Sequence, residues 1–136
     1  MQDYHKIRAW KEAHALAIDI QQLTRTLPRT GYASLRDQMM RSAQSIAFTI
    51  VEGSGAATPK EFARFLDIAI KSSSELEAQL EMGLAYGVVT DRDWRTHSAR
   101  VRAIRKMTWG LRQKVLGKES SKPDERPSQR KRRTNG

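Results

Sequence analysis

The chain has 136 residues, a length at which one domain can bury a substantial core without help from disulfides or metal ions. It contains no cysteine, which excludes disulfides, thiolate metal ligands and a cysteine nucleophile, and its formal net charge is +10. The N-terminal segment is polar and no apolar run approaches the length of a membrane span, so we expect a cytoplasmic protein without a membrane partner.

The first predicted element is a helix over residues 3–27. Its apolar residues recur at intervals of three and four, which is the pattern of a helix with one face toward a core. These residues are Trp10, Ala13, Leu16, Ile20, Leu23 and Leu27. Pro28 and Gly31 follow, and both residue types interrupt helices, so we expect the helix to end at Leu27.

A second predicted helix, over residues 34–53, carries two apolar rows. Ser34 and Asp37 have the spacing of a capping box at its start, and Gly53 is expected to end it. A surface helix of a monomer usually has one apolar stripe, so two rows indicate packing between neighbouring helices or against another subunit. The rows consist of Leu35, Met39, Ala43, Ile46 and Ile50, and of Met40, Ala47 and Val51.

Two further helices have clear start signals. Thr58, Pro59 and Glu61 combine a capping residue, a proline at the first helical position and an acid three residues after the cap, and this helix should reach Tyr86. The segment 90–93 repeats the capping pattern and opens a helix to about residue 117. A strict alternation of three and four, typical of a left-handed bundle, connects its residues Trp94, His97, Val101, Ile104, Thr108, Leu111 and Val115.

Four amphipathic helices with short connections and no strand pattern predict an all-α fold, an antiparallel up-down four-helix bundle, for residues 1–117. Residues 118–136 lack the apolar pattern and are expected to form a disordered basic tail. This tail has seven Lys or Arg against three acidic residues, so it carries +4 of the net charge and leaves +6 on the bundle.

An ordered set of residues on these helices resembles the family of four-helix bundle proteins encoded in intervening sequences of bacterial 23S ribosomal RNA genes. The set comprises Leu35, Gln38, Arg41, Ala43, Ser45, Ile46, Glu52, Gly53, Glu61, Phe62, Arg64, Phe65, Leu66, Ala69, Ser74, Glu75, Leu76, Glu77, Gln79 and Leu80, with Ile7, Trp10, Ala13 and His14 before it. The resemblance covers residues 4–116 and implies a ring of bundles, a homopentamer. Related accessory variability proteins of diversity-generating retroelements imply nucleic acid and a reverse transcriptase as partners. Thr49, where the family usually has Asn, and the basic tail depart from the pattern.

The sequence supplies no catalytic or metal site, and we expect neither a cofactor nor enzymatic activity. Di-metal sites in helical bundles use Glu-x-x-His pairs, and the chain has none. His14 and His97 lie on or beside core stripes, where histidines usually pack rather than bind metal. The glycines at 53 and 55 follow a helix and lack the Lys-Ser/Thr pair of a phosphate-binding loop.

The last predicted helix has a basic face that suits nucleic acid. Three of its cations are seven and four residues apart and therefore share a face, and no acid follows Asp93 along that row. An aligned row of cations suits a phosphate backbone, and Trp109 at its edge could stack on an unpaired base. A plain solvated face is the alternative. We expect RNA or DNA to be bound by Arg92, Arg95, Arg102, Lys106, Arg130, Lys131, Arg132 and Arg133.

Four other charged residues sit among apolar rows and are expected to form inter-helix or inter-subunit ion pairs: Arg41, Glu52, Arg64 and Glu75. Two alternatives to a nucleic-acid-binding oligomer stay open. One is an accessory protein of a diversity-generating retroelement, whose basic surface also docks a reverse transcriptase. The other is a structural scaffold whose basic character is incidental.

Overall fold

The computed structural model describes residues 2–120, and these residues form one short 3-10 turn followed by four long α-helices. The part of the chain described contains no strand, so the all-α prediction is confirmed. The elements are η1 (Tyr4–Lys6), α1 (Arg8–Thr26), α2 (Ala33–Ser54), α3 (Pro59–Ala85) and α4 (Asp91–Ser120).

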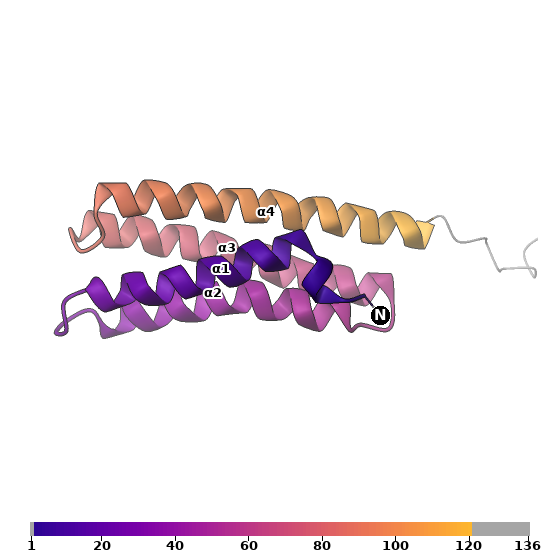
Figure 1. The fold of residues 1–136 in the computed structure, drawn as a ribbon, viewed down its shortest axis with the longest axis horizontal. Helices are drawn as coiled ribbons and strands as arrows, with labels where there is room; N and C mark the ends of the chain where they lie inside the picture. Colours follow the sequence, from indigo (N-terminus) through magenta and orange to yellow (C-terminus); the bar gives the residue numbers. More distant parts are fainter. Residues whose placement is uncertain (1, 121–136) are drawn as a thin grey trace, which may run out of the picture.

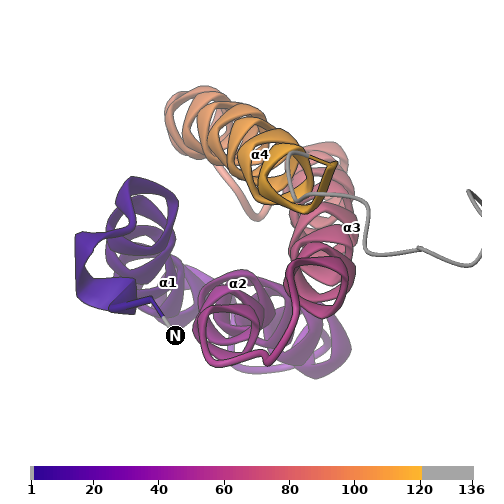
Figure 2. The same ribbon diagram turned by 90° about the vertical axis from the view of Figure 1, so that its right-hand side faces the viewer.

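The helices run up and down beside one another as a bundle (Figure 1). Viewed along the bundle, α2 lies between α1 and α3, and α3 lies between α2 and α4 (Figure 2). The α1–α2 and α3–α4 turns lie at one end, whereas the N-terminus, the α2–α3 turn and the end of α4 lie at the other. α4 packs closely along α3 but meets α1 less extensively.

The core forms where the apolar stripes of the helices meet. The first row of α2 is fully buried as predicted, whereas in the second row only Ala47 is buried and Met40 and Val51 stay partly exposed. α2 therefore packs between its two neighbours, and its second row lies at the edge of those contacts. Side chains with almost no exposed area include Leu16, Ile20, Met39, Ile46, Ile50, Leu66, Leu76, Leu80, Val101 and Ile104.

The predicted starts of α3 and α4 are confirmed. The Thr58 hydroxyl accepts a hydrogen bond from the Glu61 amide at 3.1 Å, and the Thr90 hydroxyl accepts one from the Asp93 amide at the same distance. Gly87 directly follows Tyr86, the C-cap residue of α3. It has φ +75°, a left-handed conformation that glycine adopts without strain.

The predicted start of α2 is wrong. The helix begins at Ala33, its cap residue Tyr32 makes no side-chain capping bond, and the Ser34 hydroxyl instead accepts from Gln38 Nε2. The turn before α2 is held by Arg36, whose guanidinium donates to the carbonyls of Thr24 (3.4 Å) and Pro28 (2.6 Å). Arg36 therefore satisfies carbonyls at and just after the end of α1, and because a guanidinium has no acceptor it does not cap the first amides of α2.

Two predicted helix ends also differ. α2 continues past Gly53 to Ser54, because this glycine serves the contact with α3: a Cβ atom there would lie 2.8 Å from Cδ1 of Phe62. α4 continues past Gly117 to Ser120, and the rest of the predicted tail lies outside the described residues. At the N-terminus, the extended backbone of Ile7 separates η1 from α1, so the first helix begins at Arg8.

Candidate nucleic-acid interface

The predicted cationic row of α4 is exposed along its whole length. The helix carries nine Lys or Arg against three acidic residues, so it is the most basic element described. Within residues 2–120, Arg92 and Lys106 make no side-chain ion pair or hydrogen bond. All four predicted residues of α4 are solvent-exposed: Arg92, Arg95, Arg102 and Lys106.

Arg102 shares one carboxylate with a second arginine. Glu77 of α3 accepts hydrogen bonds from Arg102 Nη1 at 3.1 Å and from Arg105 Nη2 at 2.7 Å. The Glu77 side chain is 19% exposed, whereas that of Arg102 is 54% exposed. Because one negative charge faces two positive ones, the exposed guanidinium of Arg102 keeps an unneutralised charge at the surface.

The same cluster keeps Glu77 ionised. Burial alone would raise the pKa of this carboxyl, but the hydrogen bonds from Arg105 and Arg102 outweigh burial, and the pKa is lowered. Glu77 therefore stays negative at neutral pH and anchors both arginines to α3. The cluster of Glu77, Arg102 and Arg105 connects α3 to α4, and through Arg102 it is part of the exposed basic row.

Among the described residues, the one ion-pair partner of Arg95 is Asp91, one turn earlier on α4, at 2.9 Å. Both side chains are mostly exposed, and such a pair contributes only about 0–0.5 kcal/mol. A phosphate group could therefore replace the carboxylate at little cost. Arg95 remains a candidate for contact with a polyanion.

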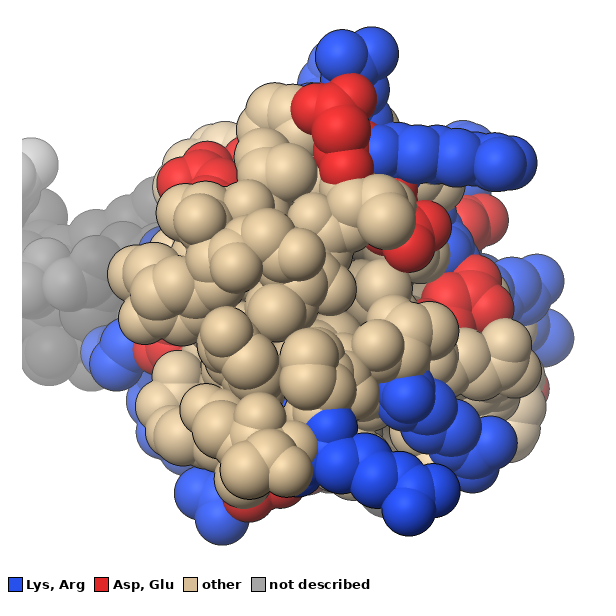
Figure 3. Space-filling view, turned by 90° about the vertical axis from the view of Figure 1, so that its left-hand side faces the viewer, with Lys and Arg blue, Asp and Glu red and all other residues tan. Residues whose placement is uncertain are grey.

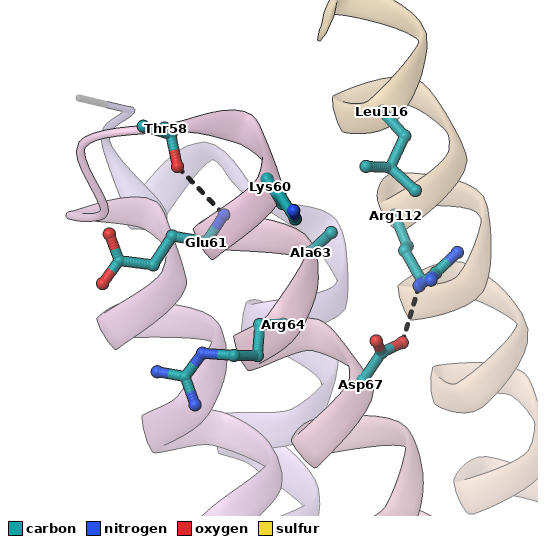
Figure 4. Close-up of a pocket in the computed structure, with 8 residues that line it drawn as sticks. All are labelled: Thr58, Lys60, Glu61, Ala63, Arg64, Asp67, Arg112 and Leu116. Atoms are coloured by element: carbon teal, nitrogen blue, oxygen red, sulfur yellow. Dashed lines mark hydrogen bonds and ion pairs between the residues drawn. The ribbon is translucent and has the colours of Figure 1, made fainter.

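Other arginines of α4 hold the bundle together, and sequence analysis missed them. Arg100 Nη1 donates to Asp19 of α1 at 2.7 Å, and Arg112 Nε donates to Asp67 of α3 at 2.6 Å. Figure 4 shows the second pair in a pocket between the start of α3 and the last turns of α4. The sequence contains a signal for these pairs. Asp67 and Glu77 on α3 are ten residues apart, as are Arg102 and Arg112 on α4, so two antiparallel helices can pair Asp67 with Arg112 and Glu77 with Arg102.

The residues predicted to form structural ion pairs lie elsewhere. All four are exposed, and within the described chain none of them forms an ion pair. Arg64 instead lies over the ring of Phe65, with its guanidinium carbon 4.8 Å from the ring centre. The inter-helix version of the prediction is thus not realised within one chain, and the inter-subunit version stays a prediction for Arg41, Glu52, Arg64 and Glu75.

Exposed aromatic and apolar side chains accompany the charges. Trp109 is 49% exposed and lies under the guanidinium of Arg112, 5.1 Å from the ring centre, so one face of the indole is already occupied. On α2 and α3, Phe48 is 59% exposed and Ile68 is 37% exposed. Large apolar groups on two adjacent helices favour contact with another molecule.

The end of the bundle that carries the α1–α2 and α3–α4 turns has few charges at its centre. Figure 3 looks onto this end and shows a mostly uncharged surface with Lys and Arg gathered at its edge. Tyr32 and Tyr86 flank the two turns, with ring centres 6.0 Å apart. Charged side chains of both signs therefore lie along parts of the edge of this end rather than at its centre.

His14 and His97, the two histidines considered as metal ligands, each contact a neighbouring side chain. His14 stacks on Trp10 with ring centres 4.9 Å apart. Burial and the neighbouring charge of Arg100 lower the pKa of the half-buried His97, which is therefore neutral at pH 7. Among the described residues, no group of three or more His, Asp or Glu is placed to hold a metal ion.

Two remaining expectations concern the tail and the membrane. The predicted nucleic-acid contacts Arg130, Lys131, Arg132 and Arg133 lie outside the described residues. None of the described helices has both the length and the apolar character needed to cross a membrane.

The chain is similar to known proteins in both sequence and fold. The sequence model of a family described as 23S rRNA-intervening sequence protein matches residues 5–110. A similar solved structure is that of a protein with unknown function from the S23 ribosomal protein family of Bacteroides thetaiotaomicron VPI-5482. It shares 23% sequence identity with a TM-score of 0.72, over 76% of this chain and 97% of that chain, which shows a common fold. A comparison with curated protein sequences gives no match.

Proposed function

The chain belongs to the family of 23S rRNA-intervening sequence proteins, and from this premise we propose that it is a non-enzymatic, homo-oligomeric protein that binds RNA or DNA. Its binding surface is the exposed row Arg92, Arg95, Arg102 and Lys106 on α4, extended by the basic residues 130–133. It acts in the cytoplasm.

The observation that carries this proposal is the unneutralised charge of α4. Arg102 shares a single carboxylate with Arg105, Arg95 has only an exposed partner on its own helix, and Lys106 has none among residues 2–120. A surface that merely keeps a protein soluble usually alternates its charges. A row of cations with surplus charge is what a phosphate backbone binds.

The oligomer is supported by a different surface. Phe48 on α2 and Ile68 on α3 are exposed, and the exposed charges Arg41, Glu52, Arg64 and Glu75 lie on the same two helices. Contact between copies would cover the apolar groups and give these charges partners. The family resemblance favours a ring of five, which would bring the basic rows of several subunits into one polyvalent surface.

Two alternatives make different predictions. As an accessory protein of a diversity-generating retroelement, the chain would bind a reverse transcriptase as well as its RNA or DNA. As a scaffold, it would bind no nucleic acid at low salt. The charged row favours a nucleic-acid binder or a reverse-transcriptase accessory protein over a scaffold. It does not distinguish the first of these functions from the second.

The test is a triple substitution on the row. Replacing Arg95, Arg102 and Lys106 together by Gln should flatten the slope of log affinity against log salt by about one for each lost phosphate contact. The loss should be similar for unrelated sequences, because phosphate contacts carry no sequence information. Fluorescence anisotropy with a labelled single-stranded oligonucleotide measures both quantities.

A matched control removes three exposed cations elsewhere: Lys11, Arg25 and Arg29 replaced by Gln. It changes the net charge by the same amount. If control and triple variant lose affinity equally, only total charge matters and α4 is not the binding face. If neither loses affinity, the nucleic-acid proposal fails.

A further inference from the structure

A groove lies between the start of α1 and the final turns of α4, the pair of neighbouring helices with the least mutual contact. Its volume is about 390 Å³, within the size range of sites that hold small ligands or a few side chains. The floor is aliphatic and consists of Ile7, Ala9, Met107, Leu111 and Val115.

Among the described side chains, every charged one that lines this groove is positive. Lys6 and Arg8 lie on one wall and Lys114 on the other, and none of these three has an ion pair or side-chain hydrogen bond within residues 2–120. None of the Asp and Glu residues whose side chains the structure describes lines the groove. The groove thus combines an apolar floor with a cationic rim on both sides.

The start of α1 strengthens the preference for an anion. Its cap residue, Ile7, makes no side-chain capping bond, and no acidic residue occurs in the first turn. The free amides and the positive end of the helix dipole therefore add to the charge of Arg8. An acidic group arriving at this wall would supply the missing negative charge.

Gly110 keeps the α4 wall of the groove low. A glycine inside a helix costs about 1 kcal/mol relative to alanine, so its presence in α4 is unfavourable for the helix itself. A Cβ atom at Gly110 would meet no atom of the described residues within 4 Å, so no contact in that part of the chain requires the glycine. The space beside it belongs to the groove.

We propose that this groove binds an acidic amphipathic helix of a partner protein. Apolar side chains one turn apart on that helix lie on the aliphatic floor, and its carboxylates lie against Lys6, Arg8 and Lys114. This is the helix-in-groove mode of recognition, in which apolar anchors supply affinity and flanking charges supply orientation.

The lining chemistry favours a peptide over the other occupants. Within residues 2–120, no aromatic ring lines the groove for a base to stack on, and polar base edges buried on aliphatic side chains would lose hydrogen bonds. The chain's own residues 121–136 are a poor occupant, because their Lys and Arg outnumber their Asp and Glu. This inference uses a different surface from the proposed nucleic-acid row and stands or falls independently of it.

The test uses the full chain and a labelled synthetic helix with Leu at positions i, i+3 and i+7 and Glu at most others, followed by anisotropy. Gly110→Leu fills the groove and should weaken binding about tenfold or more, as should Lys114→Glu. Ala99→Leu, on an exposed site of α4 that does not line the groove, should leave affinity unchanged. A helix with Lys in place of Glu should not bind.

Gly110→Leu should melt at the parent temperature or above, because leucine favours helix more than glycine does. If it unfolds, Lys114→Glu alone decides. Equal binding of the acidic helix to the parent and to both groove variants overturns the proposal. The proposal is also overturned if an oligonucleotide displaces the acidic helix and binds Gly110→Leu more weakly than the parent, which assigns the groove to nucleic acid. Displacement of the acidic helix by a peptide of residues 121–136 overturns it too, and assigns the groove to the tail.

Discussion

At the contact between α3 and α4, one partly buried carboxylate holds two guanidinium groups. Replacing Glu77 by Gln leaves Arg102 and Arg105 without their anion, and we expect the free energy of unfolding to fall by about 1–3 kcal/mol. Urea denaturation measures this change. Glu81→Gln, an exposed residue on the same helix, is the control and should change stability by less than about 0.5 kcal/mol.

The same carboxylate predicts an acid limit. Its pKa is lowered below the unfolded value, so its stabilisation is present above that value, near 4.5, and is lost as pH falls through the lower folded pKa. The stability difference between parent and Glu77→Gln should shrink in this acidic range. A difference that stays constant down to pH 2 would contradict the role of the ionised carboxylate.

His97 predicts a second loss of stability at low pH, which arises from burial of its side chain and not from an ion pair. Its pKa is lowered from 6.5 by burial and by Arg100, while Asp93 and Asp19 act in the other direction. The unfolded chain therefore takes up a proton at a higher pH than the folded chain, and stability falls as pH drops below about 6.5. Thermal melts at neutral and mildly acidic pH should differ less in His97→Gln than in the parent. The exposed His14→Gln should behave like the parent.

Gly53 sets the distance between α2 and α3. In Gly53→Ala, the new Cβ would lie 2.8 Å from Phe62 and 3.1 Å from Cβ of Phe65, so one helix must shift. We expect a loss of about 1–3 kcal/mol, measured by urea denaturation. Gly55→Ala is the control, since its Cβ would meet only the Glu52 carbonyl at 3.7 Å. Equal stability of the two variants would show that the helices are not closely fitted at this point.

Among the elements, capping signals read from neighbouring residues predicted the starts of α3 and α4 but not that of α2, and contacts that depend on helix register were not predicted. Thr58 and Thr90 cap their helices as expected, because a cap needs only the next three residues. The start of α2 was misassigned although its signal was equally local, because the Ser34 hydroxyl accepts from Gln38 within the helix and does not cap it. Amphipathic periodicity predicted which residues form the core stripes, because it depends on residues three and four apart within one helix.

The candidate site shows the same limit. Periodicity placed Arg102 and Lys106 on an exposed face of α4, as the structure has them. The equal spacing of Asp67 and Glu77 and of Arg102 and Arg112 is consistent with Glu77 meeting Arg102, but periodicity alone did not assign the pair, because it depends on how α3 and α4 are aligned. The groove between α1 and α4 was missed for the same reason, since its walls come from opposite ends of the sequence.

At the scale of the whole molecule, the exposed apolar groups of α2 and α3 predict self-association. Phe48→Glu should reduce the size of the oligomer measured by light scattering, because it places a charge where another copy would contact an apolar group. Ile18→Glu, a comparably exposed apolar residue on α1, is the control and should leave the size unchanged. A parent protein that is monomeric at micromolar concentration would contradict the ring.

Arg64 tests the same assembly through a charge. Within one chain its side chain is exposed and has no ion pair, so Arg64→Ala should barely affect a monomer. If Arg64 pairs with a neighbouring subunit, the substitution should lower both the melting temperature and the oligomer size. An unchanged melting temperature and size would remove Arg64 from the interface.

We propose that the surplus positive charge of this chain serves to bind nucleic acid. The most direct measurement is the affinity of the full-length parent protein for single-stranded RNA and DNA over a range of salt concentrations. We predict tight binding at low salt that weakens steeply, with a slope of log affinity against log salt of about three or more, as expected for several phosphate contacts. Absence of binding at low salt, or an affinity that does not change with salt, would contradict the account.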